Sequence, residues 1–308
     1  MQSTELYHIK QQFVLGMLSL VNFFSSLMWP PTGAYKSLSQ QTLPDPSSTD
    51  FIPALLYKAR SLIALNDSRS ALSIIPKNSD NVAVKAVASL ARYVDASDSL
   101  QAEATLEELR DLAIEIESED FEGSDRDKAL VRVLSATAFA RAGEVEEALE
   151  TLNTETEDLE ACVFFRGWLL TTFLTTSCFS VALLVQIYLS INRPDLAKRQ
   201  FERSKRWAED DLLLQSIESM IGLTTGKDNY ANSFSFYTEQ LGNPSLTSPH
   251  LLTARGITRI LRGEIQEAKS DLDESLEQRR SDSETEAAYI VAAGLGALKR
   301  PEAEELWL

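Results

Sequence analysis

A pattern of three positions recurs along the chain and limits the folds that it can adopt. Each copy has a small residue, an alanine twelve residues later and a large apolar residue four residues after that. Residues four apart share one face of a helix, so the last two positions lie on one helix and the first on its predecessor. Small residues at the contact let the two helices approach closely, and the large residue fills the groove beside the next unit. The closest copies are Ala59, Ala71 and Ile75; Ala136, Ala148 and Leu152; and Gly256, Ala268 and Leu272.

Looser copies of this pattern give its period. From residue 197 the central position recurs at residues 233, 268 and 303, at intervals of 35 or 36 residues. Such a period is typical of the tetratricopeptide unit of two antiparallel helices. One hairpin cannot bury its own apolar stripe but stacked hairpins can, so the sequence predicts an all-α fold, an α-solenoid of tetratricopeptide-like helix hairpins. The looser copies are Val185, Ala197 and Phe201; Ile221, Ser233 and Tyr237; and Val291, Ala303 and Trp307.

The turns of these hairpins are also recognisable. Gly143 in RAGEVEEAL, Gly263 in RGEIQEAKSDL and Asn192 in INRPDLAKRQF stand where the first helix of a hairpin should end. Glycine and asparagine tolerate the left-handed conformation that often ends a helix. Pro194 follows near the start of the next helix, where no hydrogen bond is lost. These residues therefore predict three helix-turn-helix units.

The composition fits one elongated domain spanning residues 1–308. The formal net charge is −17, which disfavours nucleic acid or anionic lipid as a direct partner and favours a basic protein surface. Eleven acidic residues between Glu103 and Asp127 face only Arg110 and Arg126. This segment is a solvated helix face followed by an acidic loop near residues 117–127, or it is an acidic patch on which a partner docks.

Two apolar segments, residues 17–34 and 164–181, break the repeat pattern. Subtracting 18 residues from the 49 between Ala148 and Ala197 leaves 31, close to the expected period, so we interpret the segments as insertions. The simplest hypothesis is that both are translated intron or wrongly assigned gene segments. A membrane span is an alternative, since residues 167–185 form an uncharged run of nearly the necessary length.

Residues that could support catalysis or metal binding are scarce. His8 and His250 lie far apart in the sequence, and Cys162 and Cys178 lack the spacing of a zinc site. The glycines of GLTTGKD at residues 222–228 lack the spacing of a phosphate-binding loop. The sequence therefore predicts no enzyme, no cofactor and no metal site.

Longer stretches of the chain resemble the epsilon subunit of coatomer, in a fungal version. The resemblance is carried by LLLQSIESMIGLTTGKDNYANSFSFYTEQL, LLTARGITRILRGEIQEAKSDLDESLEQ and ETEAAYIVAAGLGALKRPEAEELWL, and by ELYHIKQQFVLG, YKSLSQQ and ALLVQIYLSINRPDLAKRQF on either side of the two insertions. It rests on matched repeats in order rather than on one motif. The chain departs from the family at the two insertions and at its C-terminal end.

The resemblance implies a non-enzymatic component of the COPI vesicle coat. Members of this family bind and stabilise the C-terminal domain of the alpha coatomer subunit, in retrograde Golgi-to-ER and intra-Golgi transport, and associate with the Golgi membrane only through the cytoplasmic coat. A generic tetratricopeptide adaptor and a non-functional partial product of the same gene are the alternatives.

Helix positions around residue 250 are the expected partner contacts. By repeat register, His250, Thr253, Ile257 and Leu261 lie on one face of a first helix, where a partner segment could be bound in a groove. The same spacing also permits burial of Ile257 and Leu261 in the core. The other positions named for the repeat are expected to pack hairpin against hairpin.

Overall fold

The computed structural model describes residues 33–76, 78–118, 121, 123–152, 170–208, 212–226, 229–242, 249–279 and 282–295, without the side chains of 33–34, 170–179, 206–208 and 212. Within these ranges the chain forms α-helices and no β-strand, which confirms the all-α class. The helices are α2 (Gly33–Gln40), α3 (Phe51–Ala64), α4 (Ser68–Ile74), α5 (Val82–Asp95), α6 (Ser99–Glu115), α7 (Asp125–Ala142), α8 (Val145–Thr151), α10 (Leu170–Ser190), α11 (Pro194–Ala208), α12 (Leu212–Thr225), α13 (Tyr230–Leu241), α14 (Pro249–Arg262), α15 (Ile265–Gln278) and α16 (Ser283–Leu295).

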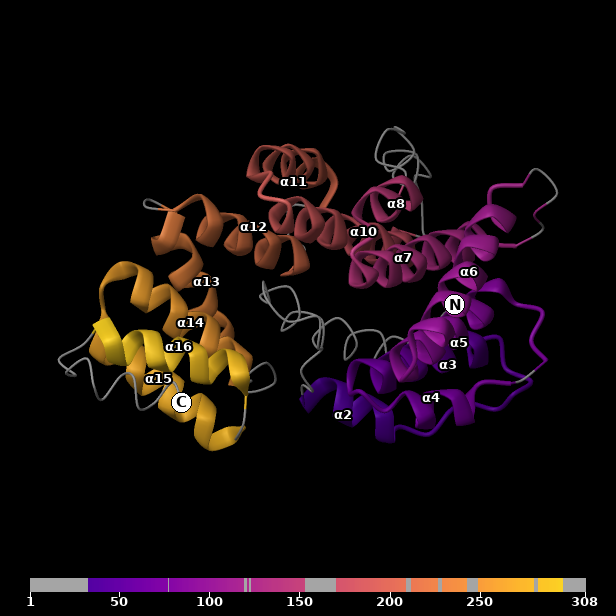
Figure 1. Cartoon of the computed structure of the whole chain (residues 1–308), viewed down its shortest axis with the longest axis horizontal. Helices are drawn as coiled ribbons and strands as arrows, with labels where there is room; N and C mark the ends of the chain where they lie inside the picture. Colours follow the sequence, from indigo (N-terminus) through magenta and orange to yellow (C-terminus); the bar gives the residue numbers. More distant parts are fainter. Residues whose placement is uncertain are drawn as a thin grey trace. The chain divides into compact units, whose positions relative to one another are not determined.

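The described residues fall into two compact units, with the boundary inside α12 between Leu214 and Gln215. In the first unit, α3 packs against α4, α5 against α6, α7 against α8 and α10 against α11. The first helices of these hairpins also pack against one another in the order α3, α5, α7 and α10 (Figure 1). This arrangement of hairpins confirms the tetratricopeptide-like solenoid.

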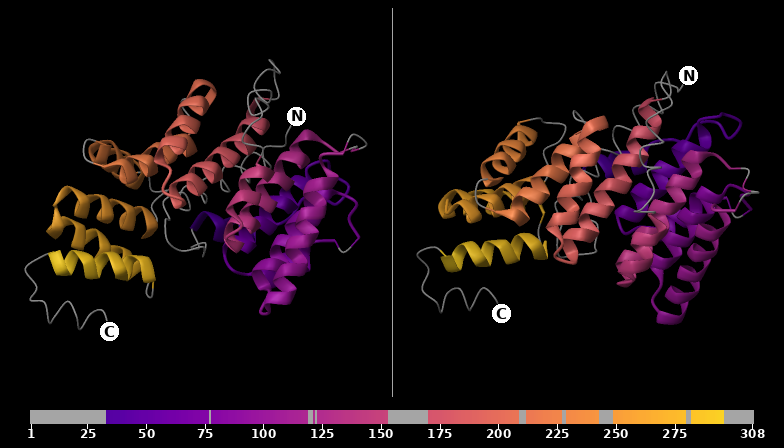
Figure 2. Two further views of the ribbon diagram at one scale, coloured as in Figure 1. Left: turned by 45° about the horizontal axis from the view of Figure 1, so that its top comes forward. Right: turned by 90° about the horizontal axis from the view of Figure 1, so that it is seen from above.

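The second unit continues the same scheme. Helices α13 and α14 pack together, α14 pairs with α15, and α16 packs against both α14 and α15. Figure 2 shows α14, α15 and α16 side by side with nearly parallel axes. That the whole chain forms one solenoid domain stays a prediction.

Four hairpins share one turn. Asn66, Gly143, Asn192 and Gly263 all have positive φ, between 58° and 86°, which confirms the three predicted turns. In each, the next residue's backbone N–H donates to the carbonyl five residues earlier, at 2.8 or 2.9 Å. This is the Schellman arrangement, in which a left-handed residue satisfies the last carbonyls of a helix. The second helix of each hairpin begins two residues after the left-handed one.

The central position of the repeat lies at one place on the second helices. It is the fourth residue of α4, α8, α11, α13 and α15, and its side chain is at most 1% exposed in all five. A further copy at Leu90, Ala102 and Leu106 places Ala102 at the same position of α6. This copy was not among those named from the sequence, and its first position holds leucine. The five residues are Ala71, Ala148, Ala197, Ser233 and Ala268.

Most of the remaining repeat positions are buried where they are described, and the exception is Val291 of the last copy, which is 49% exposed. Ala59 and Ala136 on first helices are at most 1% exposed, and Leu272 is fully buried. A side chain at Gly256 would place its Cβ 2.9 Å from Leu272 Cγ, so α14 and α15 touch closely at this glycine. The large residues Ile75, Leu152 and Phe201 are at most 8% exposed.

Two of the irregular segments predicted from the sequence are described in part. Residues 170–181 of the second apolar segment are helical and continue without a break into the rest of α10. The acidic loop joins α6 to α7, and Ser124 caps α7 by accepting a hydrogen bond from the Asp127 N–H at 3.1 Å. Ala303, Trp307 and residues 17–32 and 164–169 lie outside the described residues. None of the helices in the described ranges is both long and apolar enough to cross a membrane.

Candidate partner-binding site

The four residues predicted to bind a partner lie on α14 at different depths. His250 and Thr253 near the start of the helix are buried, with 4% and 2% of their surface exposed. Ile257, one turn later, is half-buried, and Leu261 near the end is 44% exposed. The structure therefore brings the four onto one helix face but leaves only its C-terminal end open to a partner.

Thr253 is the centre of a buried network that joins three helices. Its hydroxyl hydrogen-bonds with Ser275 Oγ of α15 at 2.9 Å and with Thr285 Oγ1 of α16 at 2.8 Å. Ser275 Oγ in turn donates to the Pro249 carbonyl at 2.8 Å. Buried hydroxyls are stable only when paired, so these contacts fix the register of the three helices.

His250 extends the network to the loop between α15 and α16. Its Nε2 lies 2.7 Å from Arg279 Nη1, which also lies 3.3 Å from Asp282 Oδ1. Burial lowers the pKa of His250 to about 4, and Arg279 adds to the effect while Asp282 opposes it. A neutral imidazole accepts the hydrogen bond that the guanidinium offers. Asp282 also caps α16, since its Oδ2 accepts from the Thr285 N–H at 3.3 Å.

Glu284 is the second residue of this cluster whose pKa is shifted. Burial, and then the neighbouring Asp282, raise its pKa to about 8 against the opposing charge of Arg279. His250, Asp282 and Glu284 offer ligand atoms that lie within 4.8 Å of one another. A cation there would have to replace Arg279, because the guanidinium already supplies the positive charge to His250 and Asp282. The donor set is therefore satisfied within the protein.

The opposite side of α14 is held to α15 by arginines. Arg255 donates two hydrogen bonds to the buried Asp271, at 2.7 and 2.9 Å, and Arg259 Nη1 lies 2.8 Å from the same carboxylate. Two guanidinium groups around one carboxylate compensate its burial. Together with the close contact at Gly256, these pairs make α14 a rigid support.

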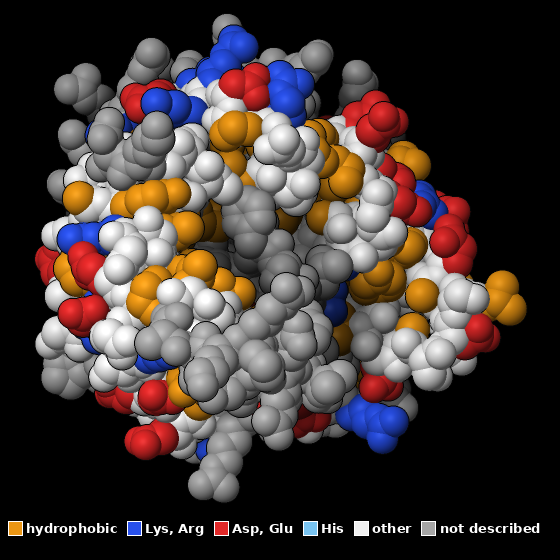
Figure 3. Space-filling view, turned by 60° about the vertical axis from the view of Figure 1, so that its left-hand side comes forward, with side chains coloured by type: hydrophobic (Ala, Val, Ile, Leu, Met, Phe, Trp, Pro, Cys, Tyr) orange, Lys and Arg blue, Asp and Glu red, His pale blue; other side chains and the backbone are white. Residues whose placement is uncertain are grey.

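Apolar side chains remain exposed where α14 and α16 end. Val291 and Leu295 of α16 are 49% and 60% exposed, and Leu261 of α14 is 44% exposed. Ile257 packs with Tyr289 against the small core of Leu272, Ala288 and Ala292. The space-filling view of Figure 3 shows apolar side chains, in orange, among acidic and basic ones. Exposed apolar surface of this kind is typical of protein contacts.

Several residues of this site could not be found from the sequence pattern. The pairing of His250 with Arg279 joins α14 to the C-terminal end of α15, 29 residues away, and no spacing rule relates them. Val291 was recognised as a repeat position, but its exposure depends on what packs over α16. The signal available in the sequence was only the apolar residue at the first position of the last copy.

Comparisons with known proteins identify the family. The model of the coatomer epsilon subunit family matches residues 31–164 and 170–305. Coatomer subunit epsilon-1 of Arabidopsis thaliana is 23% identical over 263 residues, which cover 85% of this chain and 79% of that protein. A probable coatomer subunit epsilon of Schizosaccharomyces pombe is 25% identical over 152 residues, 49% of this chain and 46% of that protein. Because the family model covers most of its length, the chain belongs to the coatomer epsilon subunit family.

Proposed function

We propose that this chain binds and stabilises the C-terminal domain of the alpha coatomer subunit within the COPI coat. It would act without catalysis in retrograde Golgi-to-ER and intra-Golgi transport, in the cytoplasm and at the Golgi membrane, which it reaches only through the coat. The observation that carries the proposal is the family match on both sides of residues 165–169, in a chain built of stacked helix hairpins.

The end of α14 is the part of the predicted site that suits such a contact. Leu261 and Val291 expose apolar surface, whereas His250 and Thr253 are buried near the start of α14 and connect it to α15 and α16. Apolar anchors on a rigid support usually carry most of the affinity of an interface. We therefore assign direct contact to Leu261, Val291 and the exposed part of Ile257, and a supporting role to the buried pair.

The test is the affinity of the full chain for a purified C-terminal fragment of the alpha subunit. The double variant Leu261→Asp/Val291→Asp should bind at least about tenfold more weakly, because it places charges in the apolar contact. Ile191→Asp is the matched control, since Ile191 is 41% exposed at the end of the α10/α11 hairpin and should leave the affinity unchanged.

The two parts of the proposal fail differently. No measurable binding of the unchanged chain would refute the partner. Unchanged affinity of the Leu261→Asp/Val291→Asp variant, with the unchanged chain binding well, would refute the site and leave the partner.

A further inference from the structure

The most exposed large apolar side chains of the described residues both lie on α6. Leu100 is 77% exposed and Ile114 is 70% exposed, whereas the others range from 41% to 60%. The two residues are fourteen positions apart, which places them about 40° from each other around the helix axis and about 21 Å apart along it. One face of α6 therefore has an apolar residue at each end.

The surface between these two residues is acidic. Glu103, Glu107 and Asp111 follow at helical spacing on the same face, and all three are exposed. Within the described part of the chain Asp111 has no ion-pair partner, so its charge faces solvent unopposed. The face therefore combines an acidic middle with one strongly exposed apolar side chain near each end.

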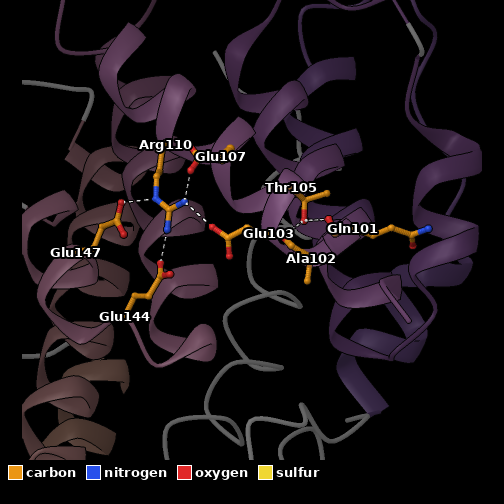
Figure 4. A network of polar contacts seen from close by, with 8 residues as sticks. All are labelled: Gln101, Ala102, Glu103, Thr105, Glu107, Arg110, Glu144 and Glu147. Atoms are coloured by element: carbon orange, nitrogen blue, oxygen red, sulfur yellow. Dashed lines mark hydrogen bonds and ion pairs between the residues drawn. The ribbon is translucent and has the colours of Figure 1, made fainter. Parts of the chain in front are cut away.

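Arg110 extends this acidic surface to the neighbouring hairpin. It pairs with Glu103 and Glu107 of its own helix at 3.2 and 2.9 Å (Figure 4). It also pairs with Glu144, which precedes α8, at 2.8 Å and with Glu147 of α8 at 2.7 Å. The Arg110 side chain is 21% exposed, and its Cζ lies 5.5 Å from the centre of the Phe139 ring. One cation among four carboxylates leaves an excess of three negative charges, held in fixed positions.

We propose that this face of α6 is a docking surface for a basic amphipathic helix of another protein. The surface includes Glu144 and Glu147, which Arg110 pairs with beside α6. The length between Leu100 and Ile114 matches a straight helix of about fifteen residues. Lysine or arginine side chains in the middle of that helix meet the carboxylates, while apolar residues near its ends cover Leu100 and Ile114.

Charge decides among the alternative occupants of this surface. Nucleic acid and anionic membranes are repelled by the same carboxylates, and a second copy of this chain carries a net charge of −17 itself. A basic protein segment is the occupant whose charge and apolar spacing both complement the face. This surface lies on the first unit, so it is separate from the α14 and α16 contact of the proposed function.

The test uses the full chain and a synthetic lysine-rich helical peptide with two leucines fourteen residues apart. Its affinity is measured by fluorescence anisotropy at physiological ionic strength. Replacing both surface residues, in Leu100→Ser/Ile114→Ser, should weaken binding about tenfold, as should serine in place of the two peptide leucines. Glu107→Gln/Asp111→Asn should weaken binding and reduce its dependence on salt.

A matched control separates docking from diffuse attraction. Glu267→Gln/Glu274→Gln removes two charges from exposed positions on α15, a helix without exposed large apolar residues among those described. The proposal requires that this control leave the affinity unchanged. The proposal is overturned if the control variant weakens peptide binding as much as Glu107→Gln/Asp111→Asn does. It is also overturned if the serine peptide binds as tightly as the leucine peptide. Binding of the chain to anionic lipid vesicles that is lost in Leu100→Ser/Ile114→Ser would overturn it as well. Far-ultraviolet circular dichroism confirms that every variant compared is folded.

Discussion

Single positions in the second unit show how closely its helices approach. Gly256 leaves no room for a side chain, because a Cβ would lie 2.9 and 3.0 Å from Leu272 Cγ and Cδ2. Leu272 is fully buried and packs in one cluster with Ala288 and Ala292. The small residue at the first position of this repeat is therefore a steric requirement of the helix pair.

Replacement of this glycine tests that requirement. We expect Gly256→Val to lower the free energy of unfolding by about 3 kcal/mol, since overpacking forces α14 and α15 apart. Urea unfolding followed by circular dichroism measures the change. Ala287→Val, at an exposed position of α16, controls for the helix propensity of valine and should cost less than about 1 kcal/mol. Equal losses for the two variants would show that the contact at Gly256 contributes nothing.

The buried cluster around His250 gives a pH dependence with a definite sign. The pKa of Glu284 is raised to about 8 in the folded chain, so the folded state holds a proton that the unfolded state releases. Stability from this group is therefore lost as pH rises from about 4.5 to 8. The pKa of His250 is lowered to about 4, so its contribution is lost as pH falls from about 6.5 to 4.

Glu284→Gln imitates the protonated carboxyl group and should remove the alkaline loss. We expect the free energy of unfolding of the variant to equal that of the unsubstituted chain near pH 5. At pH 8 we expect it to be higher by about 2 kcal/mol. The measurement is urea unfolding at several pH values, with Glu286→Gln on the exposed side of α16 as control. A stability difference that does not vary with pH would contradict the assignment to Glu284.

At the scale of helices, one turn explains much of the architecture. Asn66, Gly143, Asn192 and Gly263 each end a first helix in the left-handed conformation. A Cβ at Gly143 or Gly263 would meet nothing within 4 Å, so these glycines are required by backbone conformation rather than by space. The second helix then begins at a fixed distance, which places the central small residue against the first helix.

A graded set of substitutions at Gly263 isolates this conformational effect. We expect Gly263→Ala to lower the free energy of unfolding by about 1 to 2 kcal/mol, because alanine disfavours positive φ. Gly263→Asn should lose less than half as much, since asparagine already occupies the same turn position at 66 and 192. Thermal unfolding of the three chains gives the order, and an alanine variant as stable as the asparagine one would contradict it.

The sequence could predict these hairpins because turn, contact and spacing are local. Glycine or asparagine, a small residue and a period near 35 suffice to locate them. For the partner site the sequence predicts only a face of α14, and its contact with a partner stays a prediction. Burial of His250 depends on Arg279 and Asp282, which reach it from another helix and a loop, and exposure of Leu261 depends on what packs above it. Such tertiary contacts have no periodic signal.

At the scale of the whole molecule, each of the two units contains core clusters of its own among the described residues. The core of the first unit extends from Leu56 to Ile187, while the second holds small clusters around Tyr237 and Leu272. A unit with its own core can open without the other, because stability in repeat proteins is shared mainly between neighbours.

A cavity in the first core should therefore act on one unit. Leu109 of α6 is fully buried, and Leu109→Ala should cost about 3 kcal/mol in the first unit. Amide hydrogen exchange should then accelerate in α5, α6 and α7 and stay unchanged in α14, α15 and α16. Equal acceleration in both groups of helices would show that the molecule unfolds as one cooperative body.

The identical turns also bear on how such a chain can evolve. These hairpins share the left-handed residue that ends the first helix and the number of residues from it to the central small residue. One such hairpin can therefore replace another without changing the turn. Recombination between the gene segments for two of them would preserve both the turn and the helix contact at the junction. A family of this kind can gain or lose whole hairpins while the junctions stay intact, and so vary its length independently of the surfaces that its members present.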